Sequence, residues 1–184
     1  SEAEKVLEEA KRLIEELERR VREVLKRSKK TIEDLRREVD RVVKEHKKLI
    51  RELREIIKRV TSREVEKLLE DILRDSRRLT KELDEKLKEI NKRNAELIEE
   101  LKRILDKIRK DIKRLIEEVE KRGLPEEVAK RLKDVLRELK DLVEKIEEEA
   151  RRLNEELKEI IDRARKTLED LNRELEEVVR RARK

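Results

Sequence analysis

Apolar residues return every 18 positions along nearly the whole chain, and this repeat limits the folds that the chain can adopt. In the last third they stand at 128, 132, 135, 139, 142 and 143, and again 18 positions later at 146, 150, 153, 157, 160 and 161. Eighteen residues make five turns of an α-helix, so these positions stay on one face of a straight helix. The apolar stripe is about 120° wide, a width that suits helices packed three around one axis.

Two short segments interrupt the repeat. At the stronger one, Gly123 suits the left-handed residue that ends a helix and Pro125 suits the first turn of the next helix. At the weaker one, Thr61 and Glu64 have the spacing of a capping box. A helix continued through residues 61–62 would rotate its apolar stripe by about 110°, toward different partners. We therefore expect three helices, near residues 2–60, 63–122 and 125–184.

Short connections make consecutive helices antiparallel. The expected fold class is all-α: an antiparallel up-down-up three-helix bundle of long, nearly straight helices, each of about 60 residues, forming a single domain over residues 1–184. Apolar residues make up 34% of the chain, which is close to what the three stripes need. Few apolar residues are then left for an exposed binding patch.

The composition excludes most kinds of active site. The chain has one histidine, one glycine and no cysteine. Without cysteine there is no disulfide framework and no thiolate ligand, and one histidine cannot build a histidine-cluster zinc site. One glycine excludes the glycine-rich loops that bind phosphates. We expect no enzymatic activity, no cofactor and no bound metal.

The charged residues do not favour a nucleic-acid or membrane partner. The 56 basic and 50 acidic residues are interleaved and aromatic residues are absent, whereas nucleic-acid sites combine clustered bases with aromatic stacking surfaces. No stretch approaches the length of a membrane span, and the acidic N-terminal segment lacks the pattern of a targeting peptide. We expect a soluble protein, monomeric and requiring no partner, whose localisation stays open.

Nine polar residues interrupt the apolar stripes. Folding at the two turns sets residue i of the first helix level with about 123 − i in the second, and residue j of the second level with about 248 − j in the third. The polar residues then collect into two layers, to which all three helices contribute. One layer holds Ser28, Thr31, Asn91, Asn94 and Asn154, and the other holds His46, Ser76, Thr80 and Asn172.

We expect these residues to set the register and topology of the helices rather than to act chemically. A buried polar group without a partner costs about 1–3 kcal/mol, and grouping such residues brings donors to acceptors. A polar layer can therefore select one helix pairing over another. His46 is expected to be a neutral, hydrogen-bonded member of its layer. The alternative is a pH switch, because burial disfavours the imidazolium form.

Taken together, these features resemble de novo designed bundles of straight helices with buried hydrogen-bond networks. The features are the 18-residue repeat, the surface of Glu, Lys and Arg, the two polar layers and the connection Gly123-Leu124-Pro125-Glu126-Glu127. The resemblance implies a structural scaffold without natural biochemical function, and it assigns no site residues. The alternative is a designed interaction module: a subunit of a helical heterodimer, or a cage that captures a further helix. That alternative predicts a groove on one side of the bundle, or self-association.

Overall fold

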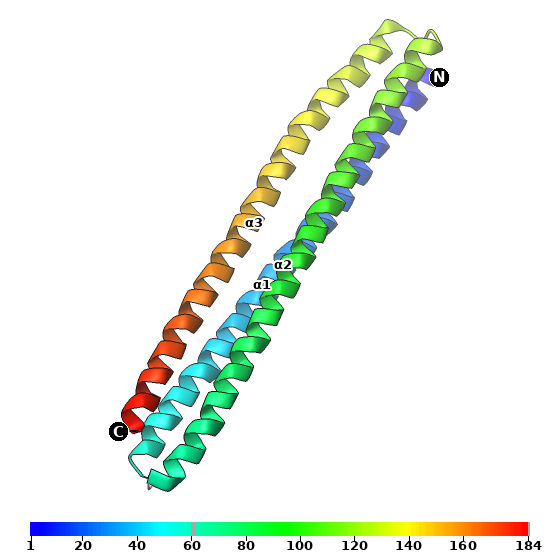
Figure 1. Cartoon of the computed structure of the whole chain (residues 1–184). Helices are drawn as coiled ribbons and strands as arrows, with labels where there is room; N and C mark the ends of the chain where they lie inside the picture. Colours follow the sequence, from blue (N-terminus) through cyan, green and yellow to red (C-terminus); the bar gives the residue numbers. More distant parts are fainter. Residues whose placement is uncertain (60–61, 184) are drawn as a thin grey trace. The chain divides into compact units, whose positions relative to one another are not determined.

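Three long α-helices form the computed structural model, which describes residues 1–59 and 62–183. The helices are α1 (Glu2–Ile57), α2 (Ser62–Lys121) and α3 (Glu126–Ala182), shown in Figure 1. Their ends fall within three residues of the expected ones, and the described residues contain no strand. Thr61, the expected capping residue, lies outside the described residues.

Contacts within the chain divide it into two compact units, each containing a segment of all three helices. Unit 1 comprises Ser1–Lys30 and Arg93–Glu155, and unit 2 comprises Thr31–Lys92 and Glu156–Lys184. Each helix continues from one unit into the other without a break. The single domain over residues 1–184 stays a prediction.

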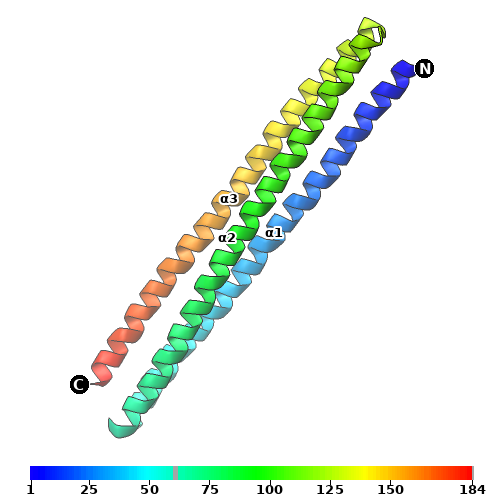
Figure 2. The same cartoon turned by 45° about the vertical axis from the view of Figure 1, so that its right-hand side comes forward.

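In unit 1, the beginning of α1 packs against the end of α2 and the beginning of α3. α1 therefore runs antiparallel to α2 and parallel to α3 in this unit. Figures 1 and 2 show the N-terminal end of α1, in blue, beside the turn that joins α2 to α3. The buried side chains of this core are Val6, Ala10, Leu115, Val119, Val128 and Leu132.

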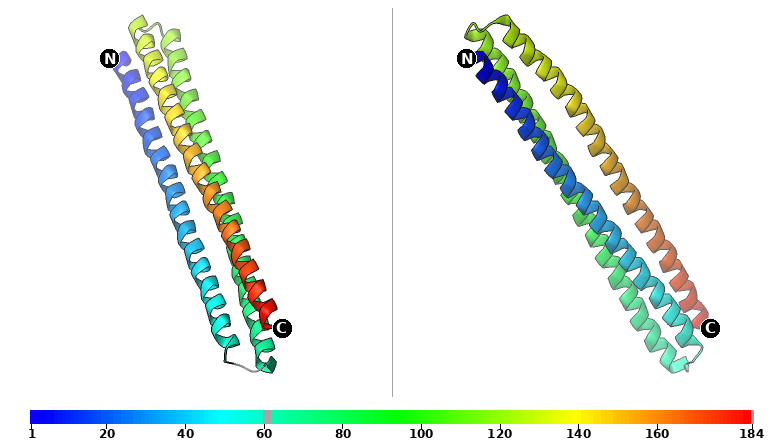
Figure 3. Two further views of the ribbon diagram at one scale, coloured as in Figure 1. Left: turned by 90° about the vertical axis from the view of Figure 1, so that its left-hand side faces the viewer. Right: turned by 180° about the vertical axis from the view of Figure 1, so that it is seen from behind.

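In unit 2, the end of α1 packs against the beginning of α2 and the end of α3. Figure 3 shows the ends of α1 (cyan) and α3 (red) side by side in both views. The same up-down-up order therefore holds in both units, which confirms the expected three-helix bundle. The buried side chains of this core are Ile50, Leu53, Val65, Leu69, Ile72, Leu171, Leu175 and Val179.

Burial follows the 18-residue repeat. Leu17, Leu35 and Leu53 stand 18 residues apart on α1, and all three are 0% exposed. Each fully buried leucine gains about 1.5–3 kcal/mol from leaving water. No large apolar side chain is exposed in the described part of the chain. The stripes therefore supply the interior, and the charged residues supply the surface.

The turn between α2 and α3 ends α2 in a Schellman motif. Gly123 has a φ of 63°, in the left-handed region that glycine adopts most easily. Its amide donates to the carbonyl oxygen of Glu120 at 3.4 Å, and the amide of Leu124 donates to that of Val119 at 3.3 Å. These two bonds define the motif, and Leu124 then packs against the core of unit 1.

Replacing Gly123 should destabilise the turn through backbone strain alone. A Cβ added at this position meets no atom within 4 Å, so any cost comes from the positive φ. We expect Gly123→Ala to lower the free energy of unfolding by about 1 kcal/mol. Gly123→Asn is the control, because asparagine tolerates this conformation better, and it should cost less. Guanidinium unfolding checks both variants, and equal stability of Gly123→Ala and the parent would contradict the prediction.

Candidate functional site: two buried polar layers

Ser28, Asn94 and Asn154 come together in unit 1, one from each helix. The hydroxyl of Ser28 donates a hydrogen bond to Oδ1 of Asn94 at 2.8 Å. Nδ2 of Asn94 donates to Oδ1 of Asn154 at 3.4 Å. Ser28 and Asn94 are buried and Asn154 is half-buried. These three residues, the Ser28 layer, form a chain of hydrogen bonds that runs from α1 through α2 to α3.

His46, Ser76 and Asn172 form the corresponding chain in unit 2. Nε2 of His46 lies 3.1 Å from Oγ of Ser76, and the Ser76 hydroxyl donates to Oδ1 of Asn172 at 3.3 Å. Thr80 lies one turn along α2 and donates to the backbone carbonyl of Ser76 at 2.9 Å. His46 and Ser76 are buried, whereas Thr80 and Asn172 are half-buried. We call these four residues the His46 layer.

Thr31 and Asn91 are the other two of the nine expected residues. Thr31 and Asn91 belong to unit 2, whereas the Ser28 layer belongs to unit 1. Thr31 is buried, but Asn91 is exposed and is therefore not a buried member of a layer. Asn91 stands at the edge of the stripe of α2, on the same side as the half-buried Leu73. At such an edge, the helical repeat alone does not separate covered from exposed positions.

The single hydroxyl proton of Ser76 sets the direction of the bonds in the His46 layer. Oδ1 of Asn172 is a carbonyl oxygen, which only accepts, so the Ser76 proton points to it. The contact between Ser76 and His46 then requires a proton on Nε2 of His46, which donates to Oγ. Nδ1 of His46 is left unprotonated and, within the described residues, without a hydrogen-bond partner. No feature of the amino-acid sequence indicates this unpaired atom.

Burial keeps the His46 imidazole neutral. The side chain is 0% exposed, and the loss of hydration lowers the pKa of His46 from its ordinary value of 6.5. Protonation of Nδ1 would place a charged N–H where it has no acceptor. The layer is therefore matched to the neutral imidazole only.

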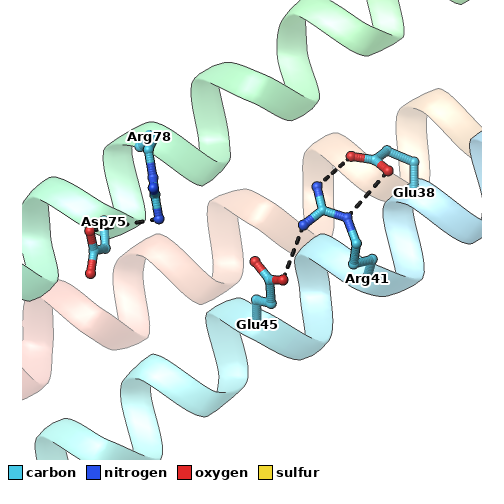
Figure 4. Close-up of polar contacts among 5 residues, drawn as sticks. All are labelled: Glu38, Arg41, Glu45, Asp75 and Arg78. Carbon is cyan, nitrogen blue, oxygen red and sulfur yellow. Dashed lines mark hydrogen bonds and ion pairs between the residues drawn. The ribbon is translucent and has the colours of Figure 1, made fainter.

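Arg41 binds two carboxylates of its own helix on the surface of unit 2, as Figure 4 shows. Its Nη2 lies 2.6 Å from Oε1 of Glu38, and its Nη1 lies 3.0 Å from Oε1 of Glu45. The hydrogen bond from Arg41 holds the pKa of Glu38 below its ordinary value. Asp75 and Arg78 form a similar pair on α2, at 3.8 Å. Exposed pairs of this kind contribute about 0–1 kcal/mol to the stability of the fold. We therefore assign them to the solvated surface and not to a binding site.

Neither a metal centre nor a membrane span is found in the described part of the chain. Residues 1–59 and 62–183 contain no group of three or more His, Asp or Glu side chains placed to hold a metal ion. Within the same residues, no helix combines the length and the apolar character that crossing a bilayer requires.

Acidification should destabilise the protein through His46. The pKa of His46 is lower in the folded chain than in the unfolded one, so stability present above pH 6.5 is lost as the pH falls below that value. Between pH 7.5 and pH 5 we expect a loss of at most about 2 kcal/mol. The His46→Asn variant, which has no group titrating there, should lose less. Guanidinium unfolding at both pH values measures the difference, and coinciding midpoints for the parent would refute the prediction.

Removing the guanidinium of Arg41 should have a small and salt-sensitive effect. Because the pKa of Glu38 is lowered by Arg41, the pair stabilises the fold above the ordinary carboxyl pKa, and this is lost as the pH falls through the folded pKa. At pH 7 we expect Arg41→Gln to cost no more than about 1 kcal/mol, and less in 1 M salt. NMR titration of Glu38 should show its pKa rising in the variant. An unchanged pKa would contradict the assignment.

The fold has a counterpart among solved structures. Comparison with protein-family models found no match, and comparison with curated protein sequences found none. A solved structure described as a computationally designed three helix bundle is similar over 98% of this chain and 88% of its own length. The TM-score is 0.70 and the sequence identity is 17%. The likeness therefore shows a shared three-helix bundle fold.

Proposed function

We propose that the chain is a designed structural scaffold, without natural biochemical activity, whose two polar layers specify helix register and topology. One observation carries the proposal. In each unit, a chain of hydrogen bonds crosses from α1 through α2 to α3 inside an otherwise apolar interior. The fold shared with a computationally designed bundle supports the same conclusion.

The pairing of residues is the same in the two units. Position 28 pairs with 94 and 94 with 154, and 18 residues away 46 pairs with 76 and 76 with 172. On the surface, α1 and α3 are joined in both units by ion pairs between residues 120 positions apart. The surface pairs are Lys29–Glu149 in unit 1, and Arg36–Glu156 and Arg54–Glu174 in unit 2.

A hydrolytic role for Ser76 is disfavoured by the direction of its hydrogen bonds. A serine nucleophile needs a histidine nitrogen that accepts its proton, and a further group that orients the imidazole. Here the Ser76 proton is committed to Asn172, and Nε2 of His46 donates rather than accepts. Nδ1 of His46 has no partner in the described structure that could orient the ring. The Ser–His contact therefore fits a structural role.

The test is to make both layers apolar and to measure the register of α3 against α1. Six substitutions do this: Ser28→Ala, Asn94→Leu, Asn154→Leu, His46→Leu, Ser76→Ala and Asn172→Leu. Stability should stay equal or rise, because apolar packing replaces buried polar groups at no net loss. Specificity should fall, because most apolar side chains also meet apolar side chains after a slip of about two turns, which the short connections can absorb.

Cysteine cross-linking reads the register inside unit 2. Arg54→Cys with Glu174→Cys marks the observed pairing, and Arg54→Cys with Thr167→Cys marks a pairing shifted by about two turns, or about 10 Å along the helix, which the short connections can span. In the parent, a short bifunctional thiol reagent should join only the first pair. In the apolar variant it should join both. If the apolar variant yields only the first cross-link, the layers do not specify register.

A pH-responsive function is the second candidate. The observation that favours it is the fully buried His46 ring, whose Nδ1 lacks a partner in the described structure. One such group gives a graded loss of stability rather than a sharp switch. This function requires that the parent lose stability on acidification and that His46→Asn lose less.

A further inference from the structure

A groove runs between α2 and α3 in unit 2, with a volume of about 790 Å³. Its lining extends from Leu73 to Leu87 on α2 and from Arg165 to Arg183 on α3. At 1.5 Å per residue these segments are about 20–27 Å long, which is the length of four to five helical turns. The apolar side chains of the lining are Leu73, Leu87, Leu168, Leu175 and Val179. Leu73 is half-buried and the other four are buried at the floor of the groove.

The hydrogen-bond chain of the His46 layer ends in this groove. Asn172 accepts from Ser76 through Oδ1, and it lines the groove together with Ser76 and Thr80. Its Nδ2 makes no hydrogen bond to any described residue, and it is not sealed from solvent. The groove therefore offers an amide donor in a lining that combines apolar and charged side chains. A side chain that enters the groove can accept from it.

The rim of the groove carries an excess of positive charge. Its bases are Arg77, Lys81, Arg165, Arg180 and Arg183, against three acids. Asp84 is already paired with Lys88 at 3.1 Å, and Arg183 with Glu66 at 3.1 Å. Among the described residues, the other four bases of the rim make no ion pair, and neither do its other two acids, Glu169 and Glu176. An occupant with acidic flanks complements this rim.

We propose that this groove docks an amphipathic α-helix from another polypeptide, one with an apolar stripe, glutamates on both flanks and one hydrogen-bond acceptor within the stripe. The apolar lining takes the stripe, Asn172 pairs with the acceptor, and the basic rim meets the glutamates. Such a helix lies against α2 and α3 as the fourth helix of a bundle does. The proposal deepens the interaction-module alternative and is independent of the scaffold function.

Two synthetic peptides of about 21 residues test the docking, that length covering the groove at 1.5 Å per residue. Both carry the same Leu/Ile stripe with one central Gln and one Trp. They differ only in having Glu or Lys at the flanks. Because the chain has no Trp, Tyr or Phe, tryptophan fluorescence reports the peptide alone. At low salt the Glu peptide should bind roughly 10-fold more tightly than the Lys peptide.

Charge reversal on the rim is compared with an equal reversal elsewhere. Arg77→Glu, Lys81→Glu and Arg180→Glu together should invert the preference between the peptides. The control is Lys44→Glu, Lys47→Glu and Arg51→Glu on α1, which changes the net charge equally at exposed positions that do not line the groove. The control should change the ratio of the two affinities by less than about 3-fold. Circular dichroism confirms that both variants remain helical.

Asn172 supplies a test of the site itself. A Glu peptide with central Leu should bind the parent more weakly than the peptide with central Gln, by roughly 5-fold. In Asn172→Leu this preference should disappear or reverse, because the amide donor is gone. A preference that persists unchanged in Asn172→Leu places the peptide elsewhere and overturns the proposal.

Three further results would also overturn the proposal. One is that the Glu peptide does not bind when the protein is at about 100 µM, because the affinity would then be too weak for a docking site. Another is an equal change in the ratio of the two peptide affinities in the rim variant and in the α1 control. The third is a solution mass near twice 22.5 kDa for the chain alone that returns to the monomer in the rim variant, since a second copy would then be the occupant. The register test involves no peptide, so its failure and the failure of docking are distinguishable.

Discussion

Inside an apolar interior, a polar side chain must find its hydrogen-bond partner on a neighbouring helix, because water is not there to supply one. This requirement gives the Ser28 and His46 layers their geometry. Each layer passes hydrogen bonds in one direction, from α1 to α2 to α3. The apolar stripes hold the helices together, but most of their contacts are also possible after a slip of about two turns. In the proposed function, the polar layers favour the observed register over the slipped one in both units.

Much of the fold could be predicted from the sequence, because the repeat and the turn residues depend on local chemistry. The 18-residue stripe predicts the buried faces, and Gly123 predicts the end of α2. The pairing of Ser28 with Asn94, and of Ser76 with Asn172, follows the level expected from folding at the turns to within one residue. These positions depend only on rise per residue and on connection length, which the sequence contains.

The rest of the structure depends on three-dimensional detail that the helical repeat does not contain. Asn91 and Asn172 both occupy stripe edges, yet Asn91 is exposed and Asn172 is half-buried. The unpaired Nδ1 of His46 follows from where a single hydroxyl proton points. The α2–α3 groove, likewise, reflects how far two half-buried edges stand apart. Side-chain rotamers and helix spacing decide these features, and the amino-acid pattern leaves both open.

The layers differ in composition although they are related by one repeat. Residues 28 and 46, 94 and 76, and 154 and 172 are each 18 positions apart on their helices, but serine stands where the other layer has histidine, and asparagine where it has serine. Four residues join α1 to α2 and four join α2 to α3, which is too short for a slip of one repeat, about 27 Å, so neither layer can meet the partners of the other. The two layers are therefore free to differ, and the chain has its one imidazole at a single level. A histidine titration consequently reports on the His46 layer alone.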